Sequence, residues 1–336
     1  MLIDFDLIII ISCFLVSLIL TVKNDFIAKT FNIYDIPDQE RKFHKTKTAV
    51  TGGIIIFTTI SIFFFLQSIK YIAEKEFLLD NIRQYFSLLL GCIIFFIIGF
   101  VDDKKNLSPN LKLIFFILTI VFLIWLDSEM NIQIISLSIL NNNFSIGFFS
   151  YLWTIICFLL FINALNMFDG INLQVAIYSL TSILYIIFFH EYLTNLLIII
   201  SFSLICFSFL NYFSKSFLGN SGSYLLGFLL GYIFIKIYNV ENNIYADEIV
   251  LLMIIPGLDL IRLFFTRLLK KKHPFSPDRS HLHHFFLKKF NNTSTFLIIS
   301  LIIWLPIVIA KITGLIFIIL ILQIIFYVLL MRKLSN

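Results

Sequence analysis

Residues 85–103 read YFSLLLGCIIFFIIGFVDD, an apolar run of 17 residues that ends in two aspartates. A transmembrane helix needs roughly 20 mainly apolar residues, so this run is long enough to cross a bilayer with its aspartates at one surface. Ten more runs have the same character. They are residues 5–22, 51–69, 110–126, 148–164, 171–189, 193–212, 222–238, 247–265, 295–310 and 313–331. The sequence predicts an all-α polytopic integral membrane protein with about 11 transmembrane helices.

The composition excludes an ordinary soluble domain. Of the 336 residues, 60% are hydrophobic and 13% are charged, whereas charged residues make up about a quarter of a typical soluble domain. Little chain remains outside the apolar runs, so we expect a single membrane domain over residues 1–336 and no nucleic-acid partner. The first run begins beside Asp4 and Asp6 and has no small-residue cleavage site, which favours a retained helix over a signal peptide.

The loops divide sharply by charge. If successive loops alternate sides, one side carries 18 Lys and Arg residues and the other carries 4. The positive-inside rule places the first set in the cytoplasm, with the N-terminus outside and the C-terminus inside. The cytoplasmic loops are then residues 23–50, 102–109, 165–170, 213–221 and 266–294, together with the C-terminal tail.

Five stretches rich in polar residues, at 36–53, 101–109, 163–172, 218–223 and 274–286, all fall on that same side. Their convergence indicates one cytoplasmic site in an inner-membrane protein. On the opposite side, residues 131–149 alternate weakly around an Asn-rich centre. This pattern favours a short β-hairpin, with an irregular loop as the alternative.

Asp102 and Asp103 end the run quoted above. A charge at membrane depth costs at least about 2.5–3.5 kcal/mol and usually marks a functional site. Two adjacent carboxylates stay ionised most easily near a cation, although a helix-end cap beside Lys104 and Lys105 is the simpler alternative. Lys112 lies just inside the next run, where its side chain would reach the same surface or serve as an interface anchor.

Two further stretches carry polar chemistry. Asn163, Asn166 and Asp169 follow a spacing of i, i+3 and i+6, which predicts one polar stripe on a helix. This stripe suits a hydroxylated substrate or Mg²⁺, or else hydrogen bonds between helices. GNSGS (219–223) opens an apolar run, so its backbone N–H groups would face an anion at a helix N-terminus.

DRSHLHH (278–284) is the densest cluster. Helical spacing predicts that His281 and His284 share a face while His283 turns away, so three-point metal chelation is disfavoured. Imidazoles beside Arg279 suit the oxygen atoms of an anionic substrate. In the preceding apolar run, a spacing of i and i+3 predicts a structural salt bridge between Asp259 and Arg262.

Together these stretches resemble the polyprenyl-phosphate N-acetylhexosamine-1-phosphate transferase family over nearly the whole chain. The motifs, in order, are DIPDQERKFHKTKTAVTGG (35–53), VDDKKNLSPNLK (101–112), NALNMFDGIN (163–172), LGNSGSYLLGF (218–228) and PDRSHLHH (277–284). The resemblance implies that a polyprenyl phosphate attacks the sugar-linked phosphate of a UDP-N-acetylhexosamine, giving a polyprenyl diphosphate-sugar and UMP. The partners it implies are undecaprenyl phosphate or a similar lipid, the UDP-sugar and membrane lipid.

The resemblance also implies roles for individual residues. Asp102, Asp103 and Asp169 would be catalytic and would bind Mg²⁺ or Mn²⁺, with Asn220 as a further ligand. The substrate-binding residues would be His44, Lys112, Asn163, Asn166, Asn172, Arg279, His281, His283 and His284.

The chain departs from the family pattern twice. Asn172 stands where the family usually has an aspartate, and Asn220 replaces the aspartate expected to bind Mg²⁺. An Asn carbonyl can bind Mg²⁺ but brings no charge.

We therefore expect a Mg²⁺-dependent transferase that starts O-antigen or a related surface glycan. The alternatives are the phospho-MurNAc-pentapeptide translocase of the same family and a catalytically impaired lipid- or nucleotide-binding scaffold. A transporter is disfavoured because the polar stretches crowd one surface and no inverted repeat is visible. The sequence is compatible with either a monomer or a homodimer.

Overall fold

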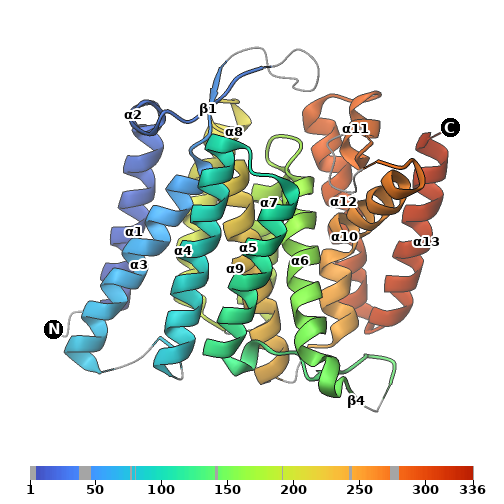
Figure 1. Cartoon of the computed structure of the whole chain (residues 1–336), viewed down its shortest axis with the longest axis horizontal. Coiled ribbons are helices and arrows are strands. Elements are labelled where there is room, and N and C mark those ends of the chain that lie inside the picture. The colour runs from blue at the N-terminus through green and yellow to red at the C-terminus, as the bar shows by residue number, and fades with distance from the viewer. Residues whose placement is uncertain are drawn as a thin grey trace. The chain divides into compact units, whose positions relative to one another are not determined.

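The computed structural model describes residues 5–37, 47–75, 78–79, 81–140, 143–190, 192–241, 244–272 and 280–335, and helices account for most of them (Figure 1). The α-helices are α1 (Phe5–Val22), α2 (Asn24–Phe31), α3 (Gly52–Glu74), α4 (Ile82–Lys105), α5 (Pro109–Leu126), α6 (Ser150–Phe168), α7 (Gln174–Phe189), α8 (Thr194–Tyr212), α9 (Gly219–Glu241), α10 (Ala246–Leu269), α11 (Leu282–Leu287), α12 (Asn292–Thr313) and α13 (Ile316–Ser335). The short elements are β1 (Tyr34–Asp35), β2 (Thr48–Ala49), η1 (Ser128–Met130), β3 (Ile134–Ile135), β4 (Phe144–Ser145) and η2 (Gly147–Phe149).

Each of the eleven predicted apolar runs forms a helix, and ten helices of the described chain are long and apolar enough to cross a membrane. The protein is therefore an all-α multi-pass membrane protein. The exception is the run at 171–189, because only Gln174–Phe189 is helical there and its 16 residues fall short of that length. Leu173 has a left-handed backbone, with φ of 70°, and this turn delays the start of α7 by three residues.

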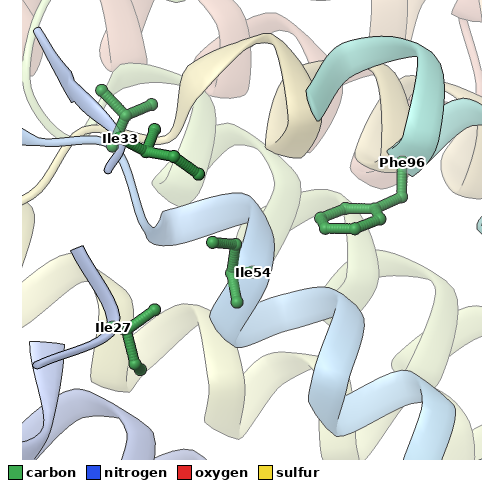
Figure 2. Packing of buried hydrophobic residues seen from close by; sticks show 5 residues of the cluster. Ile27, Ile33, Ile54 and Phe96 are labelled. Carbon is green, nitrogen blue, oxygen red and sulfur yellow. The ribbon is translucent and has the colours of Figure 1, made fainter. Parts of the chain in front are cut away.

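The chain divides into two compact units. The first comprises residues 1–128 and 175–233. In it α1, α3 and α8 pack against one another, and α4 packs against α3 and α5. A cluster of buried apolar side chains joins α2 and the β1–β2 pair to the ends of α3 and α4 (Figure 2). It comprises Ile27, Ile33, Val50, Ile54 and Phe96.

Glycines bring the start of α9 close to two helices of the first unit. A Cβ atom on Gly53 of α3 would lie 2.4 Å from the backbone nitrogen of Gly222. A Cβ atom on Gly99 of α4 would lie 2.5 Å from the carbonyl oxygen of Asn220. Because real Cβ atoms do not approach other atoms so closely, glycine at both positions is what lets the N-terminus of α9 sit against α3 and α4.

The second unit comprises residues 129–174 and 234–336. Here α10 packs against α6, α12 and α13, and the short α11 packs against α12 and α13. The predicted hairpin is confirmed: β3 and β4 pair in antiparallel fashion, with Ile134 opposite Ser145 and Ile135 opposite Phe144. Tyr238 fixes this hairpin, because its hydroxyl accepts from the Ser136 N–H at 2.7 Å and donates to the Ile134 carbonyl at 2.9 Å.

Candidate functional site

The acidic pair lies at the C-terminal end of α4, and Asp102 is the sealed member. It is 1% exposed. Its Oδ2 accepts from the Lys112 ammonium at 2.6 Å and from the Tyr224 hydroxyl at 2.9 Å. Its Oδ1 accepts from the Leu107 N–H at 2.9 Å. The Asp102 carboxylate is thus balanced by one cation and fully engaged by protein donors.

Local sequence explains how Lys112 reaches Asp102. Asn106 ends α4 in the left-handed conformation, and its N–H donates to the Asp102 carbonyl at 2.9 Å. Ser108 then caps α5 and Pro109 occupies its first turn, where the missing N–H is not needed. The chain reverses within a few residues, so the first turn of α5 presents the Lys112 side chain to the end of α4.

Asp103 is held differently. Its Oδ1 accepts from the Asn220 N–H at 2.8 Å and its Oδ2 from the Ser221 N–H at 3.0 Å, so the carboxylate faces the N-terminus of α9. GNSGS therefore does receive an anion, and that anion is Asp103, stabilised by unpaired N–H groups and the helix dipole. Gly219 has φ of 74°, and a Cβ atom there would lie 2.8 Å from Asp103 Oδ2. Asp103 itself is half-buried.

The donor set around Asp103 suits only an open metal site. Among the residues that the structure describes, no group of three or more His, Cys, Asp or Glu side chains could hold a metal ion. The Asp103 carboxylate accepts two N–H groups and the Ser221 side chain, which leaves lone-pair capacity for one further partner, while Lys112 neutralises Asp102. One carboxylate and the Asn220 carboxamide fit a Mg²⁺ whose remaining ligands are waters and substrate phosphates.

In the second unit, the polar stripe of α6 is shorter than predicted. Asn163 is turned back on its own helix, since its Nδ2 donates to the Leu159 carbonyl at 2.7 Å. The helix ends at Phe168, and Asp169 is the C-cap residue with non-helical ψ of 56°. Asp169 therefore follows the helix instead of continuing its face. Asn166 and Asn172 are half-buried on either side of this end.

Three of the four histidines that the structure describes, His281, His283 and His284, cluster around the start of α11. The His281 and His283 rings stack with centroids 5.3 Å apart at 11°, and the His284 ring meets His283 edge-on at 4.2 Å. The prediction that His283 turns away from the other two was wrong. His281 precedes the helix with extended ψ of 155°, so helical spacing does not govern its direction.

His283 also brings the histidines to the end of α6. A Cβ atom on Gly170 would lie 2.0 Å from His283 Nε2, so the imidazole rests directly against the Gly170 backbone, beside Asp169. His283 is 2% exposed. Burial, with His284 and His281 as neighbours, lowers the pKa of His283 well below its ordinary value of 6.5, so the ring is neutral at pH 7.

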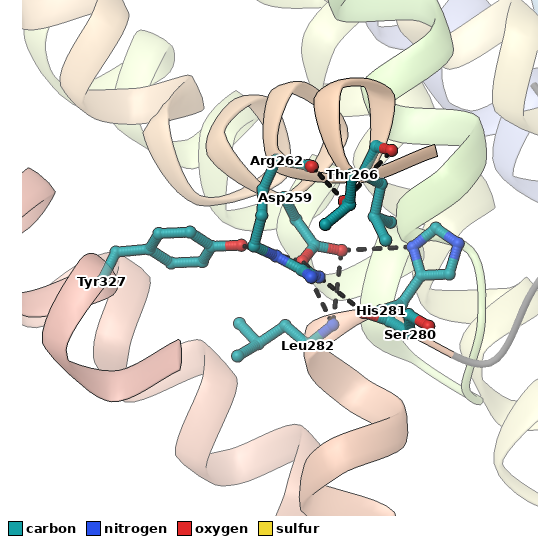
Figure 3. A network of polar contacts seen from close by, with 8 residues as sticks. Asp259, Arg262, Thr266, Ser280, His281, Leu282 and Tyr327 are labelled. Carbon is teal, nitrogen blue, oxygen red and sulfur yellow. Dashed lines mark hydrogen bonds and ion pairs between the residues drawn. The ribbon is translucent and has the colours of Figure 1, made fainter. Parts of the chain in front are cut away.

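Asp259 of α10 anchors the histidine segment (Figure 3). The predicted salt bridge is confirmed, with Arg262 Nη2 at 2.7 Å from Asp259 Oδ1. The same carboxylate also meets His281 Nδ1 at 3.1 Å and accepts from the Leu282 N–H at 3.2 Å and the Tyr327 hydroxyl at 2.8 Å. Asp259 thus joins three segments that are separate in sequence.

The structure brings the predicted residues together in two clusters, one in each unit. Asp102, Asp103, Lys112 and Asn220 meet in the first unit, and Asp169 and the histidines meet in the second. His44 and Arg279 lie outside the described residues. Sequence reasoning missed Tyr224 and Tyr327 entirely. It classed Asp259 as purely structural, although a carboxylate in an apolar run was itself a signal.

Comparison with known proteins gives the family. Residues 85–238 match the family described as glycosyl transferase family 4. The chain is 31% identical over 291 residues to an undecaprenyl-phosphate alpha-N-acetylglucosaminyl 1-phosphate transferase of Thermotoga maritima, covering 85% of this chain and 83% of that protein. It belongs to the polyprenyl-phosphate N-acetylhexosamine-1-phosphate transferase family.

Other relatives of this transferase carry similar names. A protein of the same name from Escherichia coli O157:H7 is 27% identical over 291 residues, covering 82% of this chain and 75% of the relative. A probable undecaprenyl-phosphate N-acetylglucosaminyl 1-phosphate transferase of Bacillus subtilis is 26% identical over 207 residues, covering 59% and 57%. The family match includes the whole acidic cluster and the end of α6, whereas the histidine segment lies beyond it.

Proposed function

We propose that this protein transfers N-acetylhexosamine 1-phosphate from a UDP-sugar to undecaprenyl phosphate or a similar polyprenyl phosphate. An oxygen of the lipid phosphate forms a new bond to the sugar-linked phosphorus. The bond from that phosphorus to the UMP oxygen breaks, so the products are a polyprenyl diphosphate-sugar and UMP. The proposal would place the protein at the start of O-antigen or related cell-surface glycan synthesis.

The observation that carries the proposal is the overlap between the family match and the acidic cluster. The matched residues include Asp102, Asp103, Lys112 and Asn220, which contact one another at the ends of α4, α5 and α9. Asp103 is the more accessible carboxylate, and we assign it the role of base or positioner for the lipid phosphate. Lys112, 25% exposed and fixed by Asp102, would supply positive charge to the phosphates.

The second cluster would bind the nucleotide-sugar. Imidazoles and carboxamides beside a carboxylate suit sugar hydroxyls, an acetamido group and diphosphate oxygens. We assign this role to Asn163, Asn166, Asp169, Asn172, Arg279, His281, His283 and His284, with His44 as a further contact.

We further propose a Mg²⁺ ion, with Mn²⁺ as an alternative, held by Asp103 and Asn220 together with substrate oxygens. When bound, the metal would neutralise charge on the diphosphate as UMP departs. The chain's own residues would then hold and orient the acceptor phosphate for attack.

The charge of the loops supports an inner-membrane location with the site in the cytoplasm, since 18 Lys and Arg residues lie on the side of the polar motifs and 4 on the other. The donor nucleotide would approach from that side. The loops that would form the site belong to one transferase domain over residues 1–336.

The test is release of UMP by purified protein given undecaprenyl phosphate, Mg²⁺ and UDP-GlcNAc or related UDP-N-acetylhexosamines. We expect release that requires both lipid and metal. Silence with every donor, unchanged by Asn220→Asp, would contradict the proposed activity and favour the scaffold. Turnover of only the peptide-bearing UDP-MurNAc donor would instead identify the translocase.

Asn220→Asp also tests the metal proposal by itself. The substitution restores a charged oxygen next to Asp103, so the Mg²⁺ concentration that gives half-maximal rate should fall severalfold. Ser223→Ala, in the second turn of the same helix, is the matched control and should leave that concentration unchanged.

A further inference from the structure

Asp259 lies at the centre of a hydrogen-bond network that ends on the histidine ring of the substrate cluster (Figure 3). It is 6% exposed, and within the described part of the chain it contacts the residues assigned to the nucleotide-sugar through His281. Burying a carboxylate carries a desolvation cost in free energy that the surrounding donors must offset, which indicates a specific role for Asp259.

The donors around Asp259 fix its charge state. Oδ1 faces Arg262 Nη2 at 2.7 Å, the Tyr327 hydroxyl at 2.8 Å and the Leu282 N–H at 3.2 Å. A guanidinium and a backbone N–H can only donate, so the carboxylate is ionised and accepts. Oδ2, 3.1 Å from His281 Nδ1, is then also an acceptor. When the His281 ring carries a single proton, that proton therefore sits on Nδ1.

The backbone of the segment is held by the same groups. Arg262 Nη2 donates to the Ser280 carbonyl at 2.5 Å, and the N–H of Leu282 donates to Asp259. The residues before and after His281 are thus tied to α10, which leaves the ring little freedom to rotate. Its Nε2 makes no hydrogen bond within the described part of the chain.

The position of His281 passes to its neighbour through ring stacking. The His283 ring lies over His281 at 11°, and its Nε2 edge contacts Gly170, next to Asp169. A shift of His281 would displace His283 from the end of α6. The Asp259 carboxylate therefore positions His281 directly, through a hydrogen bond, and His283 indirectly, through the stacking of the two rings.

Resting on the proposed function, we propose that Asp259 is a positioning residue that fixes the His281 proton on Nδ1 and leaves Nε2 for the diphosphate of the nucleotide-sugar. A ring protonated at Nε2 donates to a phosphate oxygen, and the adjacent Asp259 carboxylate stabilises that imidazolium. Arg262 and Tyr327 keep Asp259 in place, so the histidine presents the correct nitrogen before substrate arrives.

The first test reads the tautomer directly and needs no activity. The chain has 6 histidines, so ¹⁵N-histidine NMR of the detergent-solubilised protein, assigned with His281→Gln, resolves the two ring nitrogens. We expect the Nδ1–H form in the wild type and a mixture or the Nε2–H form in Asp259→Asn, whose amide can also donate. An Nε2–H tautomer in the wild type would overturn the proposal.

The second test is a double-mutant cycle on UMP release. Asp259→Asn should lower kcat by on the order of 100-fold with little change in the KM for lipid. It should also move the alkaline limb of the kcat profile to lower pH. In a His281→Gln background the same substitution should have no further effect, because Asp259 acts through His281. Independent, multiplying losses would mean a merely structural role and would refute the assignment.

Glu248→Gln is the matched control. Glu248 is another buried carboxylate of α10 and pairs with Lys311, away from the histidines. It should lower the melting temperature without moving the pH profile. If the wild type releases no UMP with any donor, the proposed function fails, while the NMR result still decides whether Asp259 sets the His281 tautomer.

Discussion

Asp102 and Asp103 are adjacent in sequence and identical in chemistry, yet their surroundings in the folded protein differ. Asp102 is sealed and balanced by the full charge of Lys112. Asp103 is half-buried and receives two backbone N–H groups and the Ser221 side chain from the start of α9. A carboxylate with a cation beside it is a structural anchor, whereas one supported by neutral donors without a cation keeps its capacity to bind a proton, a metal or a phosphate-bearing partner.

The largest expected effect comes from removing the accessible charge. Asp103→Asn should reduce UMP release at least about 100-fold, because the base or positioner of the acceptor phosphate is lost. The fold should survive, since the amide oxygen of the new side chain still accepts from one of the two N–H groups that Asn220 and Ser221 donate. The measurement is UMP release per folded protein, with melting temperature as the control. Near-normal turnover would show that the two carboxylates do not differ in function.

Removing the Lys112 cation should also lower the stability of the fold, apart from its effect on phosphate binding. Lys112→Met leaves Asp102 buried without its counter-charge, and we expect a loss of about 2–3 kcal/mol, below the value for a fully buried pair because Lys112 is partly exposed. Thermal unfolding in detergent measures this loss. Lys112→Met combined with Asp102→Asn should recover most of it, because no buried charge then remains. A double variant no more stable than the single one would contradict the role of the ion pair.

His283 extends the comparison to a buried group whose protonated form is disfavoured by burial and by the neighbouring histidines, so that the ring is neutral at pH 7. Since its pKa is lowered in the folded state, the unfolded chain binds a proton first as pH falls. The stabilising contribution is complete above pH 6.5 and declines below it, so stability should fall by about 1 kcal/mol between pH 7 and 5.5. Melting temperatures across this range measure the effect. In His283→Gln the decline should be smaller, and an equally steep decline would assign it to other groups.

The helices were predictable because a helix that crosses a bilayer needs about 20 apolar residues, and such a run can be recognised from the local sequence alone. The run at 171–189 failed at its start because a left-handed residue, Leu173, cannot be recognised from apolar composition. The hairpin at 131–149 was predictable from its alternating pattern and its Asn-rich centre.

The types of residue in the candidate site were predictable from the sequence, but most of the contacts between them were not. GNSGS indicated an anion, but nothing local shows that the anion is Asp103, 117 residues earlier. Tyr224 is one of 13 tyrosines, and no spacing singles out its hydroxyl as a donor to Asp102. The arrangement of the histidines was missed because His281 precedes its helix, where a helical period does not apply.

The order of synthesis adds a consequence to the Asp259 network. Arg262 follows Asp259 by 3 residues, His281 by 22 and Tyr327 by 68. At about 5–20 residues per second, the last donor leaves the ribosome roughly 3–14 seconds after the carboxylate. The histidine segment can therefore reach its final form only when α13 has inserted. A nascent chain released before residue 327 would carry every proposed catalytic residue and still lack the donor that completes the network.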